Sequence, residues 1–181
     1  LGRAAKGDLG KTVIAELSVG EKVKSRIGAT VQLSIGAWAV ATAIGIPLGV
    51  LSAVRRGSVY DYIGRFIAGV GQSVPTFWIG IMLIIAFSVE LGWLPSGGRG
   101  GPSSVILPAI TLGLWPMARI ARVLRSSLLD VLNEDYIRTA RAKGLAERRV
   151  LLEHALRNAS IPVITVIAIT YGSILGGTVI T

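Results

Sequence analysis

The stretch "IGATVQLSIGAWAVATAIGIPLGVLSAV", residues 27–54, contains no charged side chain and decides the fold class. Arg26 precedes it, and Arg55 and Arg56 follow it. A helix needs about 20 mainly apolar residues to cross the hydrocarbon core of a bilayer, so this stretch is long enough to form a transmembrane helix. Further apolar windows cover residues 66–89, 105–118 and 159–181. The sequence therefore predicts an all-α, polytopic transmembrane helical bundle.

The window at 105–118 is short, and it reaches spanning length only if its helix continues past Arg119. Each proline inside a soluble helix would cost roughly 3 kcal/mol. Neighbouring membrane helices can satisfy the carbonyls that a proline leaves free. We therefore expect membrane helices to contain Pro47, Pro75, Pro108, Pro116 and Pro162. The small-xxx-small patterns "GIPLG" (45–49) and "GSILG" (172–176) predict helix-packing sites.

Composition agrees with a membrane protein. Charged residues make up 16% of the 181 residues, whereas a soluble domain has about a quarter. The absence of cysteine excludes a disulfide framework and a thiolate metal site. In a membrane chain, the net charge of +9 favours cytoplasmic anchoring over a nucleic-acid partner. The sequence has no P-loop, nucleophile elbow or HExxH, so we expect no catalytic residue and no ATP hydrolysis by this chain.

The distribution of Lys and Arg predicts which loops face the cytoplasm. Residues 119–157 hold nine basic side chains, so we place them inside. Alternation then puts 90–104 outside, 55–65 inside and 1–26 outside. By parity, an upstream membrane helix must export residues 1–26. The predicted domains are an external segment, 1–26, and a transmembrane domain, 27–181, whose cytoplasmic loop spans about 119–158.

Within that loop, "EDYIRTARAKGLAERRVLLEHALRN", residues 134–158, predicts helix, tight turn, helix. Asn133 is the expected N-cap of the first helix, and Glu134 and Arg138 are spaced for an ion pair. Gly144 stands where a left-handed C-cap belongs, and the second helix restarts near Glu147. Small residues just before the turn leave room for another protein to approach.

The spacing of "RTARAKG" and of "HALR" nine residues later resembles the cytoplasmic EAA loop of bacterial ABC-transporter permeases, in the form found in the dipeptide/oligopeptide/nickel family. Arg138, Thr139 and Ala140 stand at the first triplet, and Gly144 stands at the glycine. Further stretches resemble the first permease subunit type of that family: "GDLG" (7–10), "GIPLGVLSAVRRGSVYD" (45–61), "SVPTFWIGIMLI" (73–84), "LGWLPSGG" (91–98) and "LPAITLG" (107–113).

The resemblance implies the fold and the partners of such a permease. The fold would be that of a type I ABC importer permease with six helices, of which this chain lacks the first and the last. The location would be the prokaryotic inner membrane. A second related permease subunit, two ATP-binding subunits and an external substrate-binding protein would complete the transporter. ATP and magnesium would bind the partner subunits, and we expect no cofactor on this chain.

The implied function is import of a short peptide, with nickel or another small solute left open. The turn at the EAA glycine would form a coupling helix that seats in a groove of an ATP-binding subunit. The expected contact residues are Arg138, Thr139, Ala140, Arg141, Ala142, Lys143, Gly144, Leu145 and Glu147. Substrate-binding residues are not assigned from the sequence.

An alternative function is an ion channel or secondary transporter that gates with proline-broken helices. It requires a buried ionisable residue at mid-membrane depth, and the four windows contain none apart from their ends. The arginines of residues 119–125 resemble a voltage sensor, but a cytoplasmic helix extension explains them better. His154 is the only histidine and has no metal-site cluster beside it, so we expect a structural role and no metal site.

Overall fold

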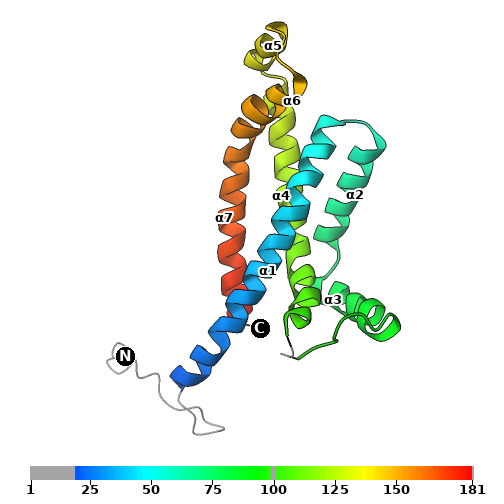
Figure 1. Cartoon of the computed structure of the whole chain (residues 1–181), viewed down its shortest axis with the longest axis vertical. Coiled ribbons are helices and arrows are strands. Elements are labelled where there is room, and N and C mark those ends of the chain that lie inside the picture. The colour runs from blue at the N-terminus through cyan, green and yellow to red at the C-terminus, as the bar shows by residue number, and fades with distance from the viewer. Residues whose placement is uncertain (1–18, 99–100, 181) are drawn as a thin grey trace.

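The computed structural model describes residues 19–98 and 101–180, and every regular element in these two ranges is helical (Figure 1). The all-α prediction is therefore confirmed. The α-helices are α1 (Val19–Val54), α2 (Val59–Ser73), α3 (Thr76–Ile84), α4 (Ile106–Leu132), α5 (Asp135–Ala142), α6 (Glu147–Arg149) and α7 (Leu156–Ile180). Shorter segments are the π-helices η2 (Ile85–Glu90) and η4 (Val150–Ala155) and the 3-10 helix η3 (Pro102–Val105).

Three described helical stretches are long and apolar enough to cross a membrane: Arg26–Val54, Pro102–Leu132 and Glu147–Gly172. The second of these confirms the continuation that the short window requires, because α4 runs through Arg119 without a break. The first begins inside a longer helix, since α1 starts at Val19, within the predicted external segment. The rest of that segment, residues 1–18, lies outside the described residues.

The window at 66–89 does not form the single membrane helix that its composition predicts. It breaks at Pro75, and α2 and the following α3–η2 segment meet at 105°. Pro75 has no N–H to continue a helix, and its ring disfavours helical backbone at the preceding residue. Val74 accordingly adopts an extended conformation, with φ −86° and ψ 131°. α2 runs back beside α1 and α3 turns away from it, so this window crosses, if at all, as a bent pair (Figure 1).

The central contact of the fold is between α1 and α4, where glycines let the two backbones approach closely. A Cβ at Gly45 would lie 2.8 Å from the carbonyl oxygen of Met117, and one at Gly49 would lie 2.8 Å from that of Ala121. The predicted packing site "GIPLG" is therefore confirmed. The prediction for "GSILG" is not borne out at Gly172, because no described atom lies within 4 Å of a Cβ built there.

Substituting Gly49 by alanine is expected to lower the free energy of unfolding by about 1–3 kcal/mol, because the methyl group overpacks the α1–α4 contact. Gly69 of α2 provides a matched control, since a Cβ there meets nothing within 4 Å. Gly69→Ala should raise the same free energy by up to about 1 kcal/mol through helix propensity. Unfolding of the purified full-length variants in detergent measures both effects. Equal shifts in the two variants would contradict the packing argument.

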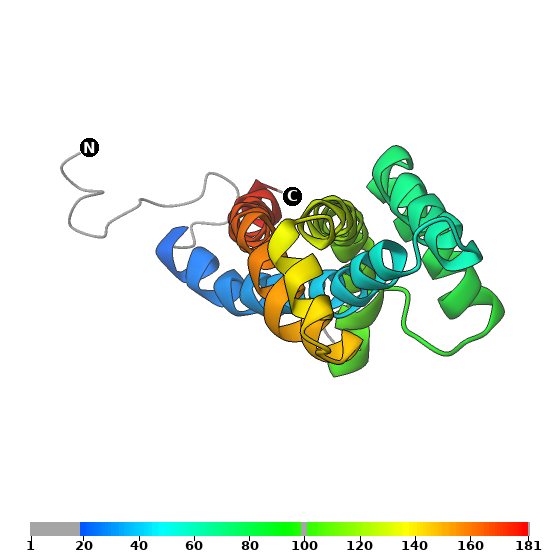
Figure 2. The same ribbon diagram turned by 90° about the horizontal axis from the view of Figure 1, so that it is seen from above.

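Both the α1–α2 turn and the α5–α6 segment lie at one end of the molecule (Figure 1). Figure 2 looks onto this end: α4 and α7 are seen along their axes, while α5 lies across them. The segment that connects η2 to α4 lies at the opposite end. This arrangement agrees with the prediction that the turn after Val54 and the basic residues 134–158 share one side of the membrane.

Candidate functional site

The turn after α5 has the left-handed glycine that the sequence predicts. Gly144 has a φ of +77°. Its N–H donates to the carbonyl of Arg141 at 2.9 Å, and the N–H of Leu145 donates to the carbonyl of Ala140 at 3.4 Å. These two bonds form a Schellman motif, which satisfies carbonyls at the end of α5. α6 then begins at Glu147, as predicted.

The start of α5 differs from its prediction by one residue. Asn133 is the C-cap of α4 and not the N-cap of α5. Its Nδ2 donates to the carbonyl of Leu129 at 2.9 Å. Glu134 occupies the N-cap position with an extended backbone. The predicted ion pair of Glu134 with Arg138 is accordingly replaced, and Arg138 contacts Asp135 at 3.2 Å. The cause is the length of α4, which continues to the residue before Asn133.

α5 is fixed to the rest of the fold from its inner face. Ile137 and Ala140 are buried and belong to the apolar core, together with Leu128 of α4 and Val150 of η4. A polar contact adds to this anchoring, because Asn158 Nδ2 of α7 donates to the Tyr136 hydroxyl at 2.8 Å. α5 therefore packs on η4, which leads into α7, and shares a buried apolar cluster with α4, while its outer face remains exposed.

Arg141 and Glu147 close the turn from outside. Arg141 Nη2 donates to Glu147 Oε1 at 2.6 Å, and Nε donates to Oε2 at 3.1 Å. The hydrogen bonds that Arg141 donates to Glu147 raise the pKa of Arg141 above its ordinary value, so the guanidinium stays charged. Exposed pairs add at most about 1 kcal/mol. The main effect of this bidentate contact is to hold the end of α5 and the start of α6 in one geometry.

The predicted contact residues gather at the tip formed by α5, the Gly144 turn and α6. Ala140 is buried and belongs to the apolar core. Leu145 is half-buried. The remaining residues are exposed: Arg138, Thr139, Arg141, Ala142, Lys143, Gly144 and Glu147.

A second site, at the α1–α2 turn, was not predicted. Asp61 of α2 is 1% exposed. Arg125 of α4 donates to it twice, from Nε to Oδ1 at 2.8 Å and from Nη2 to Oδ2 at 2.9 Å. The Gly57 N–H donates to Oδ2 at 3.0 Å, and Arg65 Nε lies 3.5 Å from Oδ1. This carboxylate fastens α2 and the turn to α4.

Sequence reasoning missed the pair because it treated residues 55–65 as a loop. The structure shortens that loop to the residues between Val54 and Val59, so Asp61 falls in the first turn of α2. One signal could have found it: Asp61, Gly64, Ala68 and Gly71 share the buried face of α2. A carboxylate on a face of otherwise small residues needs a cationic partner, because a buried charge is stable only when paired.

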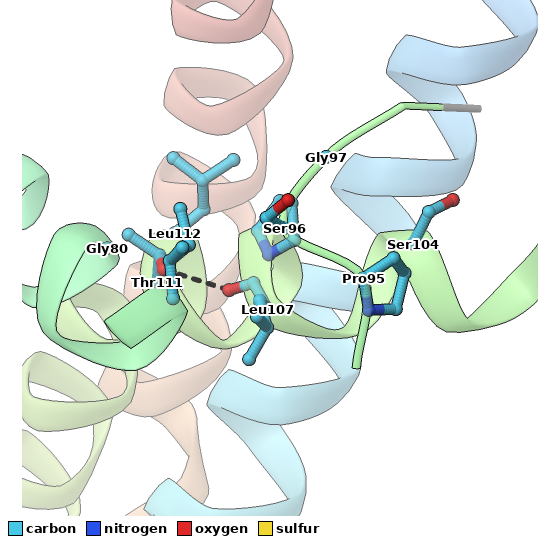
Figure 3. A pocket seen from close by; sticks show the side chains of 10 residues that line it. Gly80, Pro95, Ser96, Gly97, Ser104, Leu107, Thr111 and Leu112 are labelled. Carbon is cyan, nitrogen blue, oxygen red and sulfur yellow. Dashed lines mark hydrogen bonds between the residues drawn. The ribbon is translucent and has the colours of Figure 1, made fainter. Parts of the chain in front are cut away.

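The opposite end holds an apolar cavity of about 290 Å³ between α3, the 95–97 segment and α4 (Figure 3). Its lining consists of Gly80, Ile84, Pro95, Ser96, Gly97, Ser104, Leu107, Pro108, Thr111 and Leu112. The Thr111 hydroxyl already donates to the carbonyl of Leu107 at 2.8 Å. Among the described residues, the cavity offers no charged group for chemistry.

No group of three or more metal-ligating side chains occurs within residues 19–98 and 101–180. His154 is half-buried in η4, and its backbone carbonyl accepts a hydrogen bond from Asn158 at 3.2 Å. Two groups of interacting polar side chains therefore stand out in the described part of the chain: the tip after α5, and the buried pair of Asp61 and Arg125.

Residues 45–181 match the family described as "binding-protein-dependent transport system inner membrane component". The chain belongs to this family. Both groups of polar side chains, the tip after α5 and the pair of Asp61 and Arg125, lie inside the matched region. The predicted resemblance is thereby confirmed, and this inner membrane component is a multi-pass membrane protein. Nothing in the match favours the channel or secondary transporter.

Named relatives of this inner membrane component are similar over nearly its whole length. It is 42% identical to the dipeptide transport system permease protein of Escherichia coli K12, over 97% of this chain and 61% of that protein. It is 43% identical to the glutathione transport system permease protein of Escherichia coli O6:H1, over 99% of this chain and 59% of that protein. It is 42% identical to the oligopeptide transport system permease protein of Bacillus subtilis strain 168, over 99% of this chain and 60% of that protein. The chain thus spans about three fifths of the length of these relatives.

Proposed function

We propose that this chain is a transmembrane permease subunit of an ATP-driven importer of short peptides and forms half of the translocation path. A second related permease subunit supplies the other half, and an extracytoplasmic binding protein delivers the substrate. The relatives named above support the substrate class, because their systems are named for dipeptides, oligopeptides and glutathione, itself a short peptide. Two separate ATP-binding subunits bind ATP with magnesium and hydrolyse it.

The observation that carries this proposal is the exposed tip formed by α5, the Gly144 turn and α6. A partner that pushes on the tip also acts on α4 and α7, because Ile137 belongs to the buried cluster that α4 shares and Asn158 of α7 bonds to Tyr136 of α5. Arg138, Arg141 and Lys143 are exposed beside the small Ala142 and Gly144. Small residues allow close seating, and the charges fix the register of the partner more than its affinity.

The tip faces the cytoplasm in this proposal. The α1–α2 turn lies at the same end and carries Arg55 and Arg56, which adds to the basic residues of the tip. Lys and Arg concentrate on the cytoplasmic side of membrane proteins. The segment between η2 and α4 then faces the outside.

A cysteine at Ala142 tests both orientation and docking. Ala142→Cys in the full-length protein, expressed with its neighbouring genes and without other cysteines, should react with an impermeant thiol reagent in inverted vesicles. It should also cross-link to an ATP-binding subunit, and ATP should change the yield. Ser103→Cys is the matched control, because Ser103 is exposed at the opposite end of the molecule. It should react only in right-side-out vesicles.

Two results would contradict the proposal in different ways. Labelling of Ala142→Cys only in right-side-out vesicles would reverse the orientation. Labelling in inverted vesicles without a cross-link in any nucleotide state would remove the coupling role and favour the channel or secondary transporter.

A further inference from the structure

A cavity of about 350 Å³, lined by three arginines, lies between α1, α2 and α4, close to the buried ion pair. Its lining consists of Ser52, Gly64, Arg65, Ala68, Ala121, Arg122, Arg125 and Ser126. The small residues create the hollow, since a Cβ at Gly64 would run into the Ser52 hydroxyl. Ser52 stands two residues before the end of α1, so the cavity lies toward the end of the bundle that carries the α1–α2 turn.

The cavity has an excess of positive charge. Three guanidinium groups line it, while the one carboxylate that contacts them is Asp61, so two positive charges are left over. Arg125 uses two of its five N–H donors on Asp61, and three remain. Arg122 has no ion-pair or hydrogen-bond partner within the described ranges. The site therefore favours an anion that accepts several hydrogen bonds.

Ser52 adds a hydroxyl group to the lining of the cavity, although the residue as a whole is only 3% exposed. Ser126 lines the same cavity from α4. A ligand with acceptor oxygens in the cavity can accept hydrogen bonds from such hydroxyl groups as well as from the guanidinium groups.

The surroundings place the cavity at the level of lipid headgroups. The guanidinium of Arg55 stacks on Tyr60 at 4.7 Å from the ring centroid, and that of Arg65 stacks on Tyr62 at the same distance. Tyrosine and basic side chains concentrate where the membrane meets water. Farther along α2, Phe66 is 72% exposed. The acyl chains of a lipid can cover this exposed apolar part of α2. A free phosphate ion could not cover it, so the surface favours a lipid as the ligand.

We propose that the cavity binds the phosphodiester headgroup of an anionic phospholipid, with its acyl chains along the exposed face of α2. Arg122 and Arg65 contact the phosphate, and Ser52 and Ser126 donate further hydrogen bonds. Basic pockets between transmembrane helices bind acidic headgroups by this chemistry. The site does not depend on the transported substrate, so lipid binding tests it separately from the proposed function.

Lipid titration of the full-length protein, purified in its complex and monitored by native mass spectrometry, tests the proposal. Phosphatidylglycerol is the probe, and phosphatidylethanolamine is the neutral comparison. Arg122→Gln should weaken phosphatidylglycerol binding about fivefold, which corresponds to about 1 kcal/mol per basic residue at the membrane surface. Arg56→Gln is the matched control: Arg56 is exposed at the α1–α2 turn but does not line the cavity, so binding should not change.

Each other outcome would overturn the assignment. An equal loss in Arg56→Gln would show that binding follows the general surface charge. Displacement of the lipid by millimolar inorganic phosphate, with the same sensitivity to Arg122→Gln, would make free phosphate the ligand. Unchanged lipid binding, together with loss of a co-purifying subunit from the Arg122→Gln complex, would assign the cavity to a carboxylate of that subunit.

Discussion

Replacing Asp61 by alanine is expected to lower the free energy of unfolding by about 3 kcal/mol. The substitution leaves the guanidinium of Arg125 without its carboxylate, and breaking a buried ion pair in this way costs about 3–5 kcal/mol. The lower end of that range applies because the Arg125 side chain is 22% exposed, so water can solvate part of the unpaired guanidinium. Denaturant unfolding of the purified full-length protein in mixed micelles measures the change.

Two further variants separate the buried pair from ion pairing in general. Glu153→Ala breaks a pair of similar length, 2.8 Å to Arg149, whose two side chains are more than half exposed. Its effect should stay below about 1 kcal/mol. The double substitution Asp61→Leu, Arg125→Met should regain most of the lost stability, because no unpaired charge remains. A loss in Glu153→Ala as large as in Asp61→Ala would contradict the argument from burial.

Replacing Gly144 by valine is expected to reduce ATP-dependent peptide uptake about tenfold or more, a coupling loss within the usual range of 1–3 kcal/mol. A β-branched residue does not tolerate the φ of +77° without strain. The turn would open, and the direction in which α5 presents its outer face would change. Stability should fall by only about 1–2 kcal/mol, because a Cβ at this position meets no atom within 4 Å. Uptake into proteoliposomes with the complete transporter measures the effect.

The same substitution elsewhere shows whether strain alone explains the result. Gly92 has a φ of +62° and open surroundings at the opposite end of the fold. Gly92→Val should show a comparable stability change with nearly normal uptake. Gly144→Asn should retain most of the uptake, because asparagine adopts the left-handed conformation readily. Equal uptake in Gly92→Val and Gly144→Val would remove the special role of the turn.

The features predicted from the sequence are those that depend on local chemistry. The apolar windows, the left-handed Gly144 and the restart near Glu147 follow from hydropathy and backbone preference alone. The family also followed from local motifs. Proline shows the limit of this approach: Pro47, Pro116 and Pro162 lie inside helices as expected, whereas Pro75 breaks its window. The same ring gives both results, and the packing around it decides between them.

The features that were missed depend on contacts between distant segments. Asp61 and Arg125 are 64 residues apart, and neither lies in a spacing pattern that indicates the other. Ala140 stands in the expected contact triplet, and the fold also makes it a member of the buried cluster that contains Leu128 and Val150. In both cases the sequence supplied the residue type, and only the packing of α4 against its neighbours determined its surroundings.

The continuity of α4 has a mechanical consequence. At 1.5 Å per residue, α4 is a rod of about 40 Å. Its last turns supply Leu128 to the buried cluster that also contains Ile137 of α5, and its first turns supply Leu107 and Thr111 to the apolar cavity shown in Figure 3. The helix stays unbroken through Pro116. A tilt applied at one end therefore displaces the far wall of that cavity, as a lever does, without any conformational change inside α4.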